Sequence, residues 1–259
     1  MFSAYPRANF RLTFKDIAAL FLCGGVLPFA LGILFIETPV FDWLAYSGAT
    51  STSQIHRWLH TTFDRDWIVD LLTILVYAAM GVAIQFVILN PKKVGWRDLG
   101  FTLFHWKWAV AGIFIFAAEW ALEDFTVRQF GLEQEMERIA REYYLPTNIN
   151  SITVATALLM SGPATAVFEE VSFRGLLYRW MRQYANIPIC VLTSAALFAV
   201  IHIYLWDPGG IAGLAITGVI FMSGVAYALL YEWSRSLLPS ILLHAISNMV
   251  AVSFAVWDV

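Results

Sequence analysis

The sequence predicts an all-α fold, a polytopic membrane helix bundle with about seven transmembrane helices and one short amphipathic helix. Hydrophobic residues make up 59% of the 259 positions, against roughly 45–50% in ordinary soluble domains. Charged residues make up only 14%. The chain also contains 11 Trp, 20 Phe and 10 Tyr, and Trp and Tyr gather at membrane interfaces. This composition indicates an integral, multi-pass membrane protein.

Seven apolar segments are candidates to cross the membrane. The first, residues 17–36, follows three basic residues and precedes Glu37-Thr38-Pro39 instead of a small-residue cleavage site. We therefore interpret it as a span and not as a signal peptide. The fourth begins near Ile152, and Gly162-Pro163 is expected to kink it and free backbone carbonyls. The others cover residues 67–89, 106–122, 188–206, 209–231 and 237–257.

The most polar stretch, residues 123–150, predicts a short amphipathic helix lying at the interface. Its apolar residues recur at helical spacing, and they are Leu132, Met136, Ile139, Ala140 and Tyr143. We favour a solvated connector for this stretch, with a lid or a substrate-docking segment as the alternative.

The distribution of Lys and Arg predicts the orientation. With the N-terminus in the cytoplasm, inside loops hold eleven of the 16 basic residues and outside loops hold five. We therefore expect a cytoplasmic N-terminus and a single integral-membrane domain over residues 1–259. No basic stripe suggests a nucleic-acid partner, and Cys23 and Cys190 are typical of buried apolar positions.

Charged side chains follow the apolar run of the fourth span. Glu169 and Glu170 end it, and Arg174 comes four residues after Glu170. Ionisable residues at such depth are costly and are functional candidates. Glu170 and Arg174 share a helical face in the order that favours an ion pair, so Glu169 is the carboxylate without an obvious structural partner.

Three further polar residues stand in apolar surroundings: His202, His244 and Asn248. His202 shares a helical face with Phe198, as His244 does with Asn248, because each pair is four residues apart. If the chain turns near Asn186, Glu169 lies 17 residues before the turn and His202 lies 16 after it. In an antiparallel helix pair the two would be level, about 25 Å from the turn.

A carboxylate and an imidazole that converge can hold and deprotonate a water molecule. A second histidine and an amide could stabilise the oxyanion of a tetrahedral intermediate. Together, Glu169, His202, His244 and Asn248 suffice to hydrolyse an amide bond. The same residues could hold zinc, because two His and a Glu are a familiar ligand set, but no His-Glu-x-x-His helix is present.

Each of these residues alone is more typical of helix-to-helix hydrogen bonding than of catalysis; their joint array favours a catalytic site. One alternative is a non-catalytic immunity or scaffold membrane protein that binds a peptide or a lipid tail. Another is a proton-coupled transporter, but the sequence lacks the inverted halves of such proteins.

Three motifs carry a family resemblance: Glu-Glu-x-x-x-Arg at Glu169, Phe-x-x-x-His at Phe198 and His-x-x-x-Asn at His244. Together they resemble the CAAX-protease and bacteriocin-processing (ABI) family, which includes the type II prenyl-protein endopeptidases. The resemblance covers about residues 150–250. The stretch Trp96-Arg97-Asp98-Leu99-Gly100 also looks like a basic loop common upstream in that family.

The resemblance implies an intramembrane glutamic endopeptidase that needs no metal cofactor, with a zinc enzyme as the less favoured variant. Glu169 would activate water with help from His202. The oxyanion hole would be formed by His244 and Asn248. The site would be supported by Glu170, Arg174 and Phe198. The implied substrate is a protein or peptide, with or without a lipid group. The short chain favours a prokaryotic inner or plasma membrane.

Overall fold

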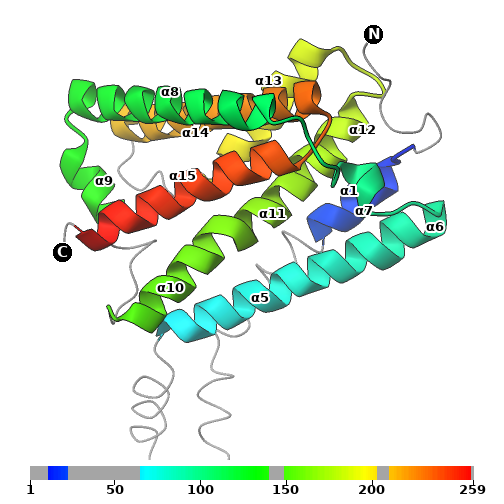
Figure 1. Ribbon diagram of the computed structural model, residues 1–259, viewed down its shortest axis with the longest axis horizontal. Helices are drawn as coiled ribbons and strands as arrows, with labels where there is room; N and C mark the ends of the chain where they lie inside the picture. The colour runs from blue at the N-terminus through cyan, green and yellow to red at the C-terminus, as the bar shows by residue number, and fades with distance from the viewer. Residues whose placement is uncertain (1–10, 23–64, 140–148, 203–209, 258–259) are drawn as a thin grey trace, which may run out of the picture. The chain divides into compact units, whose positions relative to one another are not determined.

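The computed structural model describes residues 11–22, 65–139, 149–202 and 210–257, and the regular structure in these ranges is helical (Figure 1). The all-α prediction is confirmed. Helices suit a membrane because they satisfy their backbone polar groups within one segment. By their contacts the helices form two compact units. The single domain predicted for residues 1–259 stays a prediction, because contacts do not show whether the units fold independently.

The smaller unit holds the helices before residue 94. Helix α1 covers Phe14–Phe21, and α5 (Arg65–Ala83) continues without a break as η3 (Ile84–Leu89) and α6 (Asn90–Lys92). Lys93 ends that helix in the left-handed conformation, with φ of 54°. The Nζ of Lys92 lies 3.0 Å from Oδ2 of Asp16 on α1. Most of the first predicted span, from residue 23 onward, lies outside the described residues.

The larger unit contains the helices from α7 to α15. Helix α8 (Lys107–Phe130) packs on α14 (Gly210–Ser234) and on α15 (Leu238–Trp257). Helix α14 also packs along α13 (Ile187–Ile201), and α15 packs along the segment that begins at Ser151. These contacts bring the fourth, fifth, sixth and seventh predicted spans together.

The segment from Ser151 to Met181 is one long helical stretch. It consists of α10 (Ser151–Leu159), η5 (Met160–Ala164), α11 (Thr165–Glu170), η6 (Val171–Tyr178) and α12 (Arg179–Met181). Asn150 caps its beginning, because its side-chain oxygen accepts from the backbone N–H of Ile152 at 2.9 Å. At Pro163 the helix widens into π-helical turns and continues. The carbonyl of Met160 there accepts from the Thr165 hydroxyl at 2.8 Å.

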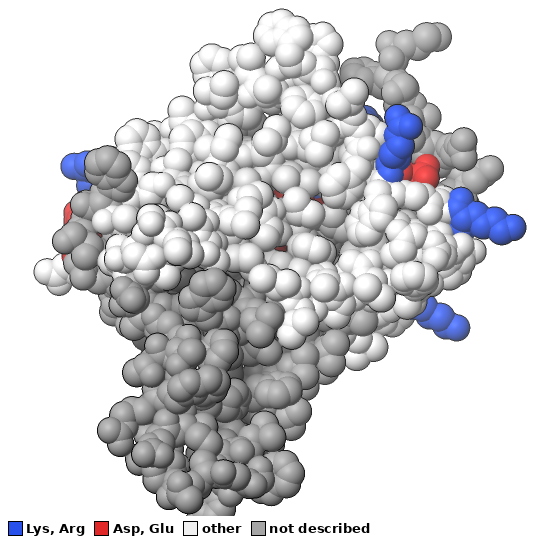
Figure 2. Space-filling model, turned by 60° about the horizontal axis from the view of Figure 1, so that its bottom comes forward, with Lys and Arg blue, Asp and Glu red and all other residues white. Residues whose placement is uncertain are grey.

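Three described helices are long and apolar enough to cross a membrane, judged by length and composition: Ile74–Lys92, Ser151–Met181 and Gly213–Ser234. Ile187–Ile201 and Leu238–Phe254 are shorter apolar helices. Figure 2 marks charged residues in colour, and the described part of the face that it shows is mostly white. Few Lys, Arg, Asp or Glu side chains therefore lie on that face, as expected for helices that face lipid. The protein is an integral membrane protein, and the number of seven spans stays a prediction.

Two elements differ in extent from the sequence-based expectation. Helix α8 continues to Phe130, past the end of the third predicted span at residue 122, and ends at Gly131, whose φ is 61°. The amphipathic stretch forms α9 (Glu133–Ile139), with residues 140–148 outside the described part. Met136 on α9 packs against Ile216 of α14, so this apolar residue of α9 faces the bundle.

The expected basic loop is a short helix, α7 (Trp96–Leu99). Its first turn is closed by Asp98, whose Oδ2 accepts from the backbone N–H of Gly95 at 2.9 Å. The carbonyl of Gly100 accepts from the N–H of Leu237 at 2.8 Å. The carbonyl of Leu99 accepts from the Tyr231 hydroxyl at 3.2 Å. The stretch from Trp96 to Gly100 therefore holds the turn between α14 and α15 in place. Helix α15 carries His244.

Candidate active site

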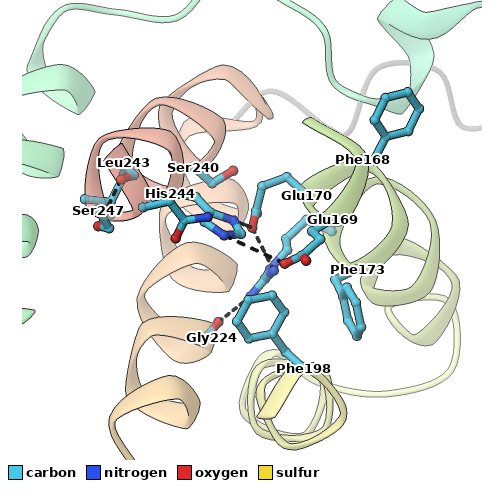
Figure 3. Close-up of polar contacts among 12 residues, drawn as sticks. Phe168, Glu169, Glu170, Phe173, Phe198, Gly224, Ser240, Leu243, His244 and Ser247 are labelled. Carbon is cyan, nitrogen blue, oxygen red and sulfur yellow. Dashed lines mark hydrogen bonds and ion pairs between the residues drawn. The ribbon is translucent and has the colours of Figure 1, made fainter. Parts of the chain in front are cut away.

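The charged residues of the first motif lie where α11 passes into η6 (Figure 3). Glu170 and Arg174 are fully buried, and Nη1 of Arg174 donates to Oε1 of Glu170 at 2.8 Å. The ion pair expected from their spacing is present. Breaking such a buried pair leaves an uncompensated charge, which costs about 3–5 kcal/mol.

Arg174 is also held by groups far away in the sequence. Its Nη2 donates to the carbonyl of Gly224 on α14 at 3.0 Å. Its Cζ lies 4.7 Å from the ring centre of Phe198 and 5.3 Å from that of Tyr227. Aromatic faces stabilise a desolvated guanidinium. Phe198 therefore has a clear place in the site, as one wall around Arg174.

His244 reaches the same carboxylate from α15 (Figure 3). Its Nδ1 lies 3.1 Å from Oε1 of Glu170. Because Arg174 already pairs with Glu170, that oxygen accepts, and we assign the proton to Nδ1 of His244. The ring of Tyr227 stacks on the imidazole, with centroids 4.9 Å apart and planes at 18°. The ring of His244 is thereby fixed, and its Nε2 faces Glu169 at 3.7 Å from Oε2.

His202 approaches the same atom from the end of α13. Its Nδ1 lies 2.7 Å from the backbone carbonyl of Phe198. A carbonyl only accepts, so this nitrogen must donate. The other nitrogen, Nε2, lies 3.9 Å from Oε2 of Glu169. The two residues are level, as the spacing about the turn near Asn186 predicts.

Glu169 is the least satisfied member of the group. Its Oε2 is buried and has no hydrogen-bond partner within the described part of the chain. When both imidazoles are neutral, two ring nitrogens and one carboxylate oxygen, all of them acceptors, face one another. Separations of 3.7 and 3.9 Å are too long for direct hydrogen bonds but suit a bridging water. The arrangement can hold and polarise a water molecule.

Asn248 lies one turn beyond His244 on α15 but is engaged elsewhere. Its Nδ2 donates to the carbonyl of Ser161 at 2.7 Å, within the π-helical stretch that contains Pro163. The backbone carbonyl is thus satisfied by a side chain from another helix. One N–H of the Asn248 amide is used in this bond, and the second is left for another acceptor.

A metal site was the less favoured variant. Among the residues that the structure describes, no group of three or more His, Cys, Asp and Glu side chains is arranged to hold a metal ion. The metal-free reaction stays a prediction.

Two parts of the site were missed by sequence reasoning: Tyr227 and the Gly224 carbonyl. They carry no sequence signal, because an apolar helix rich in glycine gives no indication of which carbonyl or ring will face an arginine. A further buried residue, Glu119, was also missed, although the sequence did give a signal for it. It is an ionisable residue inside the third predicted span, and such residues are functional candidates by default. Both of its carboxylate oxygens are buried.

Comparison with known proteins gives one match, which covers the part of the chain that contains the site. No curated protein and no solved structure matches the chain. A family model does match, that of the Rce1-like type II CAAX prenyl endopeptidases, over residues 151–250. The match indicates a CAAX-type membrane protease acting on a protein or peptide. Residues 151–250, which hold all seven predicted site residues, thus carry the signature of the Rce1-like type II CAAX prenyl endopeptidases, the family to which the three motifs point.

Proposed function

We propose that this protein is an intramembrane endopeptidase of the glutamic type, which hydrolyses a peptide bond near the membrane. The observation that carries the proposal is the convergence of two imidazole Nε2 atoms on one unsatisfied oxygen of Glu169, at 3.7 and 3.9 Å. A fully satisfied structural carboxylate would have its donors in hydrogen-bonding positions instead.

Glu169 acts as the general base and His202 orients the water. One water proton passes to Glu169 while the water oxygen attacks the carbonyl carbon of the scissile bond. The Nδ1–H of His202 is committed to a backbone carbonyl, so its Nε2 accepts from the water. When the C–N bond breaks, Glu169 returns the proton to the leaving amine. The products are a carboxylic acid and an amine, and the atoms of one water are consumed.

His244 and Asn248 stabilise the oxyanion of the tetrahedral intermediate. Because Nδ1 of His244 donates to Glu170, Nε2 becomes a donor only in the imidazolium form. The same ring can therefore donate to the oxyanion once it carries its second proton. Asn248 contributes its second amide N–H, the first being held by Ser161. Arg174 holds Glu170 in place through the ion pair at 2.8 Å.

The reaction proceeds without a metal cofactor, since the groups above supply base, orienter and oxyanion donors. We further propose a protein or peptide substrate that is lipidated or otherwise anchored in the membrane. The proposed location is a prokaryotic inner or plasma membrane, with the N-terminus in the cytoplasm as the positive-inside distribution suggests.

The test compares wild type with Glu169→Ala in membranes, using prenylated and plain peptides and mass spectrometry to find cut sites. We expect cleavage by wild type, resistance to chelators, and loss of cleavage in the variant. Thermal unfolding of the purified variants controls for folding. Cleavage retained by a folded Glu169→Ala protein would refute the mechanism. Inhibition by chelators, reversed by zinc, would instead favour the metal variant.

A further inference from the structure

The pair Gly162-Pro163 stands in the long helical stretch that packs along α15, and the proposed reaction gives it no role. Pro163 has no backbone N–H, and the helix widens here into the π-helical turns of η5. Turns of this kind are frequent at functional sites. Within them, the carbonyl of Ser161 accepts from Nδ2 of Asn248 at 2.7 Å. This part of the helix is therefore tied directly to a residue of the proposed oxyanion hole.

Gly162 is buried where η5 packs against α15. A Cβ at this position would lie 2.5 Å from Cγ and 3.1 Å from Sδ of Met249, and 3.5 Å from the carbonyl oxygen of Ala245. The first of these separations is far inside the distance of about 3.5–4.0 Å at which two carbon atoms pack. The absence of a side chain at Gly162 therefore allows α15 to lie as close to η5 as it does.

Asn248 reaches η5 from the same side of α15. It lies next to Met249 and three residues after Ala245. The approach that brings this part of α15 to Gly162 therefore also brings Asn248 to Ser161. An asparagine amide is planar and carries two N–H groups on one nitrogen. When the Ser161 carbonyl holds one N–H at 2.7 Å, the plane of the amide sets the direction of the other.

We propose that Gly162 is a positioning residue for Asn248. Because Gly162 has no side chain, α15 comes close enough to η5 for Asn248 to donate to Ser161, and this bond directs the second N–H of the amide toward the oxyanion. The inference rests on the proposed function for the role of Asn248 in catalysis. Gly162 itself touches neither the water nor the peptide; it acts through Asn248.

The first measurement reads the Asn248 amide by NMR without any substrate. The sequence has six asparagines, so ¹⁵N-labelled asparagine gives few side-chain signals in detergent-solubilised protein, and Asn248→Ala identifies the relevant one. In wild type, we expect the amide proton that is bonded to Ser161 to exchange slowly with deuterium from the solvent. Gly162→Ala should speed this exchange about tenfold, as for the loss of one hydrogen bond, because the added methyl group pushes α15 away.

A second substitution tests the steric cause. Met249→Ala removes the Cγ and Sδ atoms that the added methyl group would meet, so the double variant Gly162→Ala, Met249→Ala should exchange nearly as slowly as wild type. Gly112→Ala is the matched control, because a Cβ there meets nothing within 4 Å. Unchanged exchange in Gly162→Ala, or an equal rise in Gly112→Ala, would overturn the inference. If Gly162→Ala alone does not fold, the double variant decides, and fast exchange in its folded form would also overturn the inference.

Kinetics then connect the amide to catalysis, using a peptide that wild type cleaves. Removal of one oxyanion donor costs about 10²–10³-fold in kcat, so a displaced donor in Gly162→Ala should lower kcat roughly tenfold, with little change in KM. Adding Met249→Ala should restore kcat. A purely structural role would lower the folded fraction and leave kcat per folded molecule unchanged, which would contradict the inference. If wild type cleaves no peptide while the exchange still responds, the positioning of Asn248 is supported and the proposed function fails.

Discussion

Two glutamates in the larger unit, the partly buried Glu169 and the buried Glu232, show how environment separates chemistry from structure. Glu232 is paired on every side. The Tyr178 hydroxyl donates to its Oε2 at 2.9 Å, Arg182 Nε lies 3.4 Å from the same oxygen, and Arg235 Nη1 lies 3.2 Å from Oε1. Glu169 has two imidazoles at 3.7 and 3.9 Å instead.

The two carboxylates differ in the kind of group that faces them. Two arginines and a phenol surround the carboxylate of Glu232, so Glu232 ties η6 to the end of α14. The neighbours of Oε2 of Glu169 are instead two imidazoles, which can gain or lose a proton. A carboxylate that activates water must be able to accept a proton.

The largest expected effects come from exchanging each glutamate for glutamine. Glu169→Gln should lower kcat by about 10²–10⁴-fold, the usual contribution of a general base, with little change in thermal unfolding. Glu232→Gln should do the opposite, costing about 1–3 kcal/mol of stability through unpaired partners while the folded fraction still cleaves peptide. Cleavage assays and thermal unfolding on both variants check the pair. Equal losses of kcat would erase the contrast.

The two arginine partners provide a second comparison. Arg174 is fully buried on Glu170, so Arg174→Met should cost about 3–5 kcal/mol of stability. Arg182 is partly exposed, and Glu232 keeps Tyr178 and Arg235 when it is lost. Arg182→Met should therefore cost about 1 kcal/mol or less. Adding Glu170→Gln to Arg174→Met should recover part of the loss. Unfolding in detergent measures the stability lost in each variant. A larger loss for Arg182→Met than for Arg174→Met would contradict the prediction.

A third comparison concerns the helix contact that places the Gly224 carbonyl against Arg174. A Cβ at Gly224 would come within 3.0 Å of the Cα of Ala195 on α13. Gly224→Ala should therefore cost about 1–3 kcal/mol and lower cleavage by shifting the Arg174 contact. Gly218→Ala on the same helix is the control, since a Cβ there meets nothing within 4 Å. Similar stability of the Gly224→Ala and Gly218→Ala variants would show that the site does not depend on the close contact of α13 with α14.

Local spacing predicted the contacts that lie within one helix or across one short turn. Glu170 and Arg174 meet because four residues make about one helical turn. Glu169 and His202 meet because the turn near Asn186 makes an antiparallel pair with equal arms. Asn248 shows the limit of this reasoning. It shares a face with His244, yet α15 crosses the fourth span so that His244 contacts Glu170 while Asn248 contacts Ser161.

The sequence by itself determined a helical membrane protein, the family signature in residues 151–250, and the pairs one turn apart, because composition and helical periodicity are local properties. The tertiary structure alone decided that Gly224 accepts from Arg174 and that Tyr227 stacks on His244. Helical periodicity specifies only the face on which a side chain lies. The residue it meets across an interface depends on the crossing angle and register of two packed helices, and these are set by the side chains of both.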